Sequence, residues 1–382
     1  MAHGFGLHPR MMASLWRGGT SKGLFVTRRE LQHMLQQSEF RPGLQLDSLE
    51  SYKALAPMLS PIMGSPDISE RQLDGLGGGI SSLRNLTAAV GPCLTKALLN
   101  KHILEQPDLT HATRIRDTLT GNKSVCLPLT VNLFNENTRK IIRSTFMVRR
   151  FPYQESWRWL FEPRGNFLMP GLPVPGSEVR LQWLDPGGSK TNKTLPTGNS
   201  TDTITVNGKQ YSVSLVDISN PGIFVDGRQF ECDSSDSPTE LDARTDLMRT
   251  LDDIRCAGTQ AMGLDPNDKA VPKIVMVFPP SSGSHHIDCL ALSMQKAHKA
   301  VPGTLAMNLG AACQIEGTIP SRLSRKTSNG KIVIGHPSGT AETSAKITKG
   351  HVEYVEISRT ARGLMQGYVM PAFRDYEVEE AS

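Results

Sequence analysis

One segment in the C-terminal half, residues 304–315, constrains the fold of this chain more than any other feature. It follows Pro302 and Gly303 and is so rich in Ala, Leu and Met that a helix here would have little polar surface to expose. Such a helix must be buried on most sides, so the rest of the chain has to pack around it. We therefore expect it at the centre of a strand-rich unit.

The surrounding sequence is typical of strands separated by tight turns. The Asn-Gly pair at 207–208 lies between two β-rich runs and predicts a type I′ hairpin. A second Asn-Gly pair, at 329–330, precedes another β-rich run. Residues 127–148 hold two such runs around an Asn-Glu-Asn turn, and residues 15–26 predict a strand, a glycine turn and a second strand.

Two further helices are expected, one on each side of a turn-rich boundary. Residues 247–262 repeat apolar groups at helical spacing and end at Gly263, and residues 86–98 show the same spacing despite a Gly-Pro pair. The polar stretch 185–193 separates the two halves. We predict one domain over residues 1–190 and another over 191–382, with the last strand able to return to the first domain.

Composition excludes several classes of protein. The formal charge of +5 comes from 42 basic and 37 acidic residues that are scattered along the chain, so no nucleic-acid partner is expected. No apolar run has bilayer length, so no membrane partner is expected. The 6 cysteines lack metal-ligand spacing, which predicts no metal site, a reducing compartment and a cytoplasmic location.

Clusters of Gly, Ser, Thr and Asn stand where strands are predicted to end or helices to begin. Backbone amides and hydroxyls at a helix N-terminus bind carboxylates well. Any one cluster alone is typical of an ordinary turn, so the information lies in their combination and order. The clusters cover residues 17–23, 77–82, 195–199, 219–221 and 335–339.

In that order the clusters resemble the PrpF-type methylaconitate isomerase family, which has a two-domain diaminopimelate epimerase-like fold. The resemblance implies an α+β protein in which each domain is a strongly curved, mostly antiparallel sheet around a central helix, with a substrate cleft between the domains. Other segments that carry it are 64–67, 72–78, 85–92, 184–186, 272–274, 293–298, 317–318 and 359–362.

The resemblance implies isomerisation of small unsaturated tricarboxylic acids of the methylaconitate or aconitate type. A proton is removed next to an activated double bond and another is returned across the delocalised system. This chemistry needs a base of tuned pKa and fixed donors for the charge that develops on the carboxylate. It needs no cofactor and no metal, so the expected partner is a small polycarboxylate. A homo-oligomer is compatible with the sequence.

The chain departs from the family at one place. In the family a glycine-rich segment continues into Thr-Ser-Lys, whose lysine is the catalytic base, and a later Gly-Asn-Cys-Gly-Asn provides the partner acid or base. Here Ser81-Ser82 passes through Leu83-Arg84 directly to Asn85. The family lysine and cysteine are therefore absent, together with a few dozen residues, and the first domain is shortened near 82–85.

Three explanations of this departure stay open: a gene model or splice form that has lost an exon, a paralogue or accessory subunit that binds carboxylates without catalysis, or an enzyme with relocated chemistry. In the third case Lys22 is the candidate base, and its pKa must fall from about 10.4 to roughly 7 or 8. His298 and His336 are expected to have structural hydrogen-bonding roles. The expected substrate-binding residues are Thr20, Ser21, Ser81, Ser82, Asn85, Gly303 and Thr304.

Overall fold

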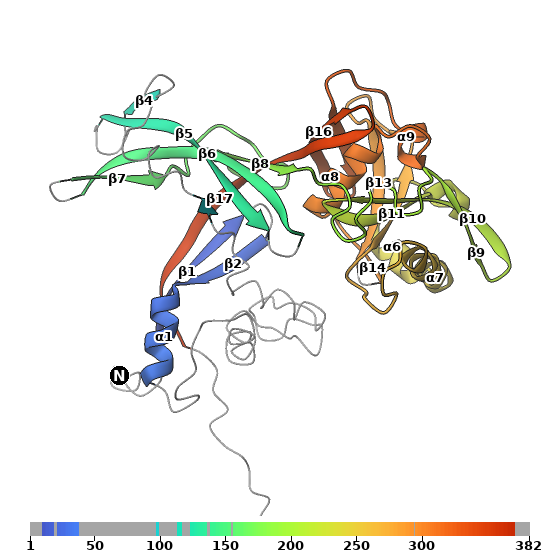
Figure 1. The fold of residues 1–382 in the computed structure, drawn as a ribbon, viewed down its shortest axis with the longest axis horizontal. Helices are drawn as coiled ribbons and strands as arrows, with labels where there is room; N and C mark the ends of the chain where they lie inside the picture. The colour runs from blue at the N-terminus through green and yellow to red at the C-terminus, as the bar shows by residue number, and fades with distance from the viewer. Residues whose placement is uncertain are drawn as a thin grey trace, which may run out of the picture. The chain divides into compact units, whose positions relative to one another are not determined.

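The computed structural model describes residues 10–18, 21–37, 97–98, 113–116, 123–135, 138–153, 156–293 and 295–370 (Figure 1). The protein is a mixed α+β chain that divides into two compact units. One unit comprises Met1–Lys96 and Ala361–Ser382, and the other comprises Ala97–Thr360. No described helix is long and apolar enough to cross a bilayer.

The first unit contains a three-stranded antiparallel arrangement in the order β2–β1–β17. Its elements are β1 (Met11–Gly18), β2 (Ser21–Val26), α1 (Arg28–Gln37) and the end of β17 (His351–Val369). The predicted strand, turn and strand over 15–26 are confirmed. Helix α1 was not expected, although Leu31, Met34 and Leu35 give it one buried apolar face.

The second unit begins with antiparallel strands. They are β3 (Ala97–Leu98), β4 (Thr113–Arg116), β5 (Lys123–Asn135), β6 (Lys140–Tyr153), β7 (Ser156–Phe161) and β8 (Glu178–Leu184). The pair β5 and β6 confirms the two runs predicted within 127–148. The helix predicted over 86–98 is wrong at its end, because Ala97 and Leu98 pair with β5; residues 86–96 lie outside the described residues.

The rest of the second unit builds a mixed sheet with helices on both of its faces. The strands are β9 (Asp202–Val206), β10 (Lys209–Ile218), β11 (Asn220–Asp226), β12 (Lys273–Phe278), β13 (Ile287–Ser293), β14 (Lys296–Ala297), β15 (Lys331–His336) and β16 (Gly339–Thr348). The helices are η5 (Gly227–Phe230), α6 (Pro238–Ala243), α7 (Thr245–Ala261), α8 (Gly303–Ala312) and α9 (Ile319–Leu323).

Alternate residues of these strands pack toward different helices, which is why the strands are apolar on both faces. In β12, Ile274 and Met276 join the core around α7, whereas Val275 and Val277 join the core around α8. Residues 305–312 of α8 are all buried. Helix α8 contacts β10, β11, β15 and β16, so the prediction of a central helix within a strand-rich unit is confirmed.

The turns follow their sequence signals. Asn207 and Gly208 both have positive φ, 50° and 77°, as the predicted type I′ hairpin between β9 and β10 requires. Gly263, with φ 73°, follows α7 as predicted. Residues 185–193 form turns and are tied to β10 because the buried Asp217 accepts hydrogen bonds from them. The division into domains at residue 190 stays a prediction.

Candidate carboxylate-binding site

The structure places some of the residues that the sequence singles out for binding. Gly303 and Thr304 are the first two residues of α8. Ser21 and Lys22 begin β2, where their register partners in β1 are Gly18 and Arg17. A substrate-binding role for these residues stays a prediction. The remaining four, Thr20, Ser81, Ser82 and Asn85, lie outside the described residues.

The N-terminus of α8 presents free backbone donors. Pro302 precedes the helix and no side chain caps it. The first helical hydrogen bond runs from the amide of Ala306 to the carbonyl of Pro302 at 2.8 Å, so the amides of residues 303–305 have no partner within the helix. These amides and the helix dipole attract an anion. Gly303 and Thr304 are partly exposed, and Gly303 adds no side chain beside their amides.

Arg359 brings a cation to the same helix end. Its guanidinium lies so close to Gly303 that a Cβ there would stand 3.1 Å from Nη2. Its Nη1 donates to the carbonyl of Ser358 at 3.0 Å. Burial lowers the pKa of Arg359, and within the described part of the chain no acidic side chain opposes this effect. A half-buried cation without a carboxylate partner is suited to binding an anion from solution.

Two histidines belong to the same region, because both His298 and Arg359 lie close enough to His336 to act on its pKa. His336 ends β15, and His298 precedes α8. The amide of Ser338 donates to Nδ1 of His336 at 3.2 Å, and the amide of Ala300 donates to Nδ1 of His298 at 3.1 Å. Each neutral ring therefore carries its proton on Nε2.

Several effects act on the pKa of His336. Burial lowers it, a hydrogen bond with the backbone of Thr340 opposes this change, and the nearby His298 and Arg359 side chains lower it further. These effects together favour the neutral form of His336. The structural hydrogen bonds expected for both histidines are present.

Two of the small-residue clusters converge on α8. In the cluster 219–221, Ser219 Oγ donates to the carbonyl of Thr304 at 3.0 Å. The buried Asn308 amide donates to the carbonyl of Asn220 at 2.8 Å, which holds the same turn against the helix. In the cluster 335–339, the amide of Ser338 donates to the carbonyl of Lys299 at 3.0 Å. Two clusters that are more than 100 residues apart in the sequence therefore both lie at the N-terminal end of α8.

Sequence reasoning did not select Arg359 as a site residue. The segment 359–362 contributed to the resemblance but received no role, because an arginine in a strand gives no local sign that its charge will be buried without a partner. The only available signal was that segment 359–362 is one of the segments that carry the family resemblance.

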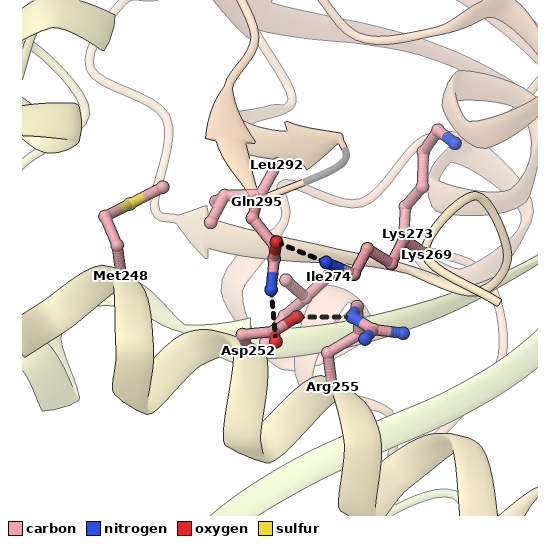
Figure 2. A pocket seen from close by; sticks show the side chains of 8 residues that line it. All are labelled: Met248, Asp252, Arg255, Lys269, Lys273, Ile274, Leu292 and Gln295. Carbon is pink, nitrogen blue, oxygen red and sulfur yellow. Dashed lines mark hydrogen bonds and ion pairs between the residues drawn. The ribbon is translucent and has the colours of Figure 1, made fainter. Parts of the chain in front are cut away.

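A second feature of this unit is a cavity of about 10 Å³ between α7 and the β13–β14 turn (Figure 2). A single water needs a comparable volume, so a carboxylic acid does not fit there. Its walls are formed by Met248, Asp252, Arg255, Lys269, Lys273, Ile274, Leu292 and Gln295. It is part of the packing of α7 against β12 and β13 and is no substrate pocket.

Comparison with solved structures defines the fold class. A solved methylitaconate-delta-isomerase superposes with a TM-score of 0.63 at 23% identity, covering 98% of this chain and 100% of its own. The chain therefore has the fold of that isomerase. The chain belongs to the PrpF protein family, which it matches over residues 115–371.

Two relatives extend over most of the sequence. The 3-methylitaconate isomerase of Eubacterium barkeri is 28% identical over 395 residues, with coverage of 94% of this chain and 97% of the relative. The 2-methyl-aconitate isomerase of Shewanella oneidensis is 27% identical over 421 residues, with coverage of 94% and 96%. Because 421 exceeds the 382 residues of this chain, the second relative contains residues without a counterpart here.

Proposed function

We propose that this chain binds small unsaturated polycarboxylic acids at the N-terminus of α8 and isomerises them by cofactor-independent proton transfer. The observation that carries this proposal is the Arg359 guanidinium at Gly303, beside free helix amides and without an acidic partner among the described residues. The relatives named as methylitaconate and methylaconitate isomerases support the choice of substrate class.

The geometry suits the charge that such a reaction creates. Removing a proton next to a double bond spreads negative charge onto the adjacent carboxylate, and fixed donors around that carboxylate lower the barrier. The α8 amides, Arg359 and the Nε2 donor of His298 supply such donors. They are held in place by the backbone hydrogen bonds described above, so little reorganisation is needed when the charge develops.

The proton-transfer group is a separate part of the proposal. Lys22 is the candidate base. Its register partner across β1 and β2 is Arg17. A lysine acts as a base only in its neutral form, which requires a pKa well below the ordinary value.

A second candidate function is carboxylate binding without catalysis, as an inactive paralogue or an accessory subunit. The sequence favours this alternative in one respect, because 81–85 lacks both the lysine and the cysteine of the family. The longer alignment with the Shewanella relative agrees with a loss of residues from this chain. Sequencing the transcript across codons 82–85 would test whether an exon is missing there.

Deuterium exchange separates the two functions. The purified protein is incubated in heavy water with cis-aconitate, trans-aconitate or methylaconitate, and incorporation is followed by NMR. Incorporation supports the isomerase, whereas binding without incorporation supports the inactive paralogue. The Lys22→Ala variant should lose exchange, and the control Lys331→Ala, which removes an exposed lysine paired with Glu342, should retain it. Equal exchange rates in both variants would rule out Lys22 as the base.

A further inference from the structure

Gln295 occupies an unusual position three residues before His298. It lies in the turn between β13 and β14 with φ 62°, a left-handed backbone conformation that residues other than glycine rarely adopt. Such a conformation persists only where surrounding contacts hold it.

The side chain of Gln295 makes hydrogen bonds to Asp252 and Lys269, which we call the clasp (Figure 2). Its Nε2 donates to Asp252 Oδ2 at 2.7 Å, and its Oε1 accepts from Lys269 Nζ at 3.0 Å. The other oxygen of Asp252 accepts from Arg255 Nε at 2.7 Å. Arg255 is only 5% exposed and also donates to the carbonyl of Asp268. The clasp therefore connects the turn to a buried anchor on α7.

The chain that follows the clasp leads directly into the candidate site. The amide of Ala297 donates to Asp242 of α6 at 2.7 Å, and the amide of His298 donates to the carbonyl of Ala291 at 2.8 Å. Helix α8 begins at Gly303, five residues after His298. These hydrogen bonds tie the backbone on both sides of the Ala297–His298 peptide bond to the structure next to the turn.

We propose that Gln295 is a positioning residue for the carboxylate-binding site and acts through His298. This inference rests on the proposed function. The clasp on Asp252 and Lys269 keeps the left-handed turn in place, and the turn aims the Nε2 donor of His298 toward the anion. Without the clasp the segment gains freedom, and the donor is misaligned for part of the time.

A matched pair of variants tests this role. In Gln295→Gly the backbone conformation becomes easy to adopt and the clasp is lost. Asn207→Gly makes the same change elsewhere, since Asn207 has φ 50° and its amide lies 3.4 Å from Asp253 of α7. With trans-aconitate as the probe, calorimetry should show binding weakened of order ten-fold in Gln295→Gly and unchanged in Asn207→Gly.

A double-mutant cycle shows whether Gln295 acts through His298. If it does, Gln295→Gly should weaken binding little further in a chain that already carries His298→Ala. Additive losses of affinity would mean that Gln295 acts independently of His298. A purely structural role would lower the unfolding temperature without changing affinity.

The results distinguish a failure of the positioning role of Gln295 from a failure of carboxylate binding at α8. Additive losses, or equal affinities of Gln295→Gly and Asn207→Gly, overturn the positioning role while wild-type binding upholds the site. A wild-type protein that does not bind trans-aconitate overturns both.

Discussion

The guanidinium of Arg359 lies at the first residue of α8, Gly303, with Nη2 placed 3.1 Å from the point that a Cβ would occupy. Strand β17 thus contributes a full charge, and helix α8 contributes amide donors, to the region at the N-terminus of α8. Either element alone would be an ordinary structural feature. Their coincidence, with no acidic side chain against Arg359 in the described part of the chain, makes this region suitable for a carboxylate.

The first prediction concerns the charge of Arg359. Arg359→Gln should weaken trans-aconitate binding by about ten- to a hundred-fold, because hydrogen bonds to a charged group contribute about 1.5–3 kcal/mol. Arg359→Lys should fall in between, since lysine keeps the charge but loses the planar fork. Calorimetric titration measures both.

The control for this prediction is Arg249→Gln. The Arg249 side chain is 72% exposed and pairs with Asp246 on the surface of α7. The Arg249→Gln substitution removes the same net charge as Arg359→Gln, but at a distance from α8. If both arginine variants weakened binding equally, the effect would reflect net charge and the assigned site would be wrong.

The second prediction concerns the space above Gly303. Gly303→Ala places a methyl group against Nη2, so the guanidinium must move and the amides become less accessible. Affinity for trans-aconitate should fall about ten-fold, while stability should stay the same or rise, because alanine is the better helix former by up to about 1 kcal/mol. Gly283→Ala, where no atom lies within 4 Å, is the control and should bind normally. Unchanged affinity in Gly303→Ala would contradict the proposed geometry.

The third prediction concerns pH. Burial lowers the pKa of His336 below its ordinary value in the folded protein. As the pH falls below about 6.5, the unfolded chain takes up a proton that the folded chain does not, so stability is lost as the pH falls through the folded pKa. Urea unfolding from pH 8 to pH 5 should show this slope, and His336→Gln should make it shallower. An identical slope in the variant would contradict the assignment.

Some parts of the fold were predictable because local chemistry alone determines them. Asn207 and Gly208 tolerate positive φ, which fixes the hairpin type. The apolar composition of α8 leaves it no exposed face, which fixes its burial. In both cases the residues themselves restrict the outcome, whatever the rest of the chain does.

Other parts depend on partners that are distant in sequence. Ala97 and Leu98 suit a helix by spacing, but pairing with β5 makes them a strand. Strand β17 has no clear alternation, and its extended form follows from pairing with β8, β16 and β1. Arg359 becomes a candidate ligand only because this pairing places it over α8. The site was therefore less predictable than the fold.

The last prediction concerns two buried threonines near α8. Thr343 is 2% exposed, touches Gly310, and its hydroxyl has no hydrogen-bond partner among the described residues. Thr318 is fully buried, and its hydroxyl donates to the carbonyl of Ala312 at 2.7 Å and accepts from the amide of Ser321 at 3.1 Å. Valine has nearly the shape of threonine without the hydroxyl, so the same substitution should have opposite effects.

Thr343→Val should leave the free energy of unfolding unchanged or raise it by up to about 1 kcal/mol, because an unpaired hydroxyl is removed from the core. Thr318→Val should lower it by about 1–3 kcal/mol, because the amide of Ser321 and the carbonyl of Ala312 lose a partner. Urea unfolding of the two variants measures the difference. Equal destabilisation would mean that the Thr343 hydroxyl is hydrogen-bonded in solution, and that the core around α8 is more polar than its protein contacts indicate.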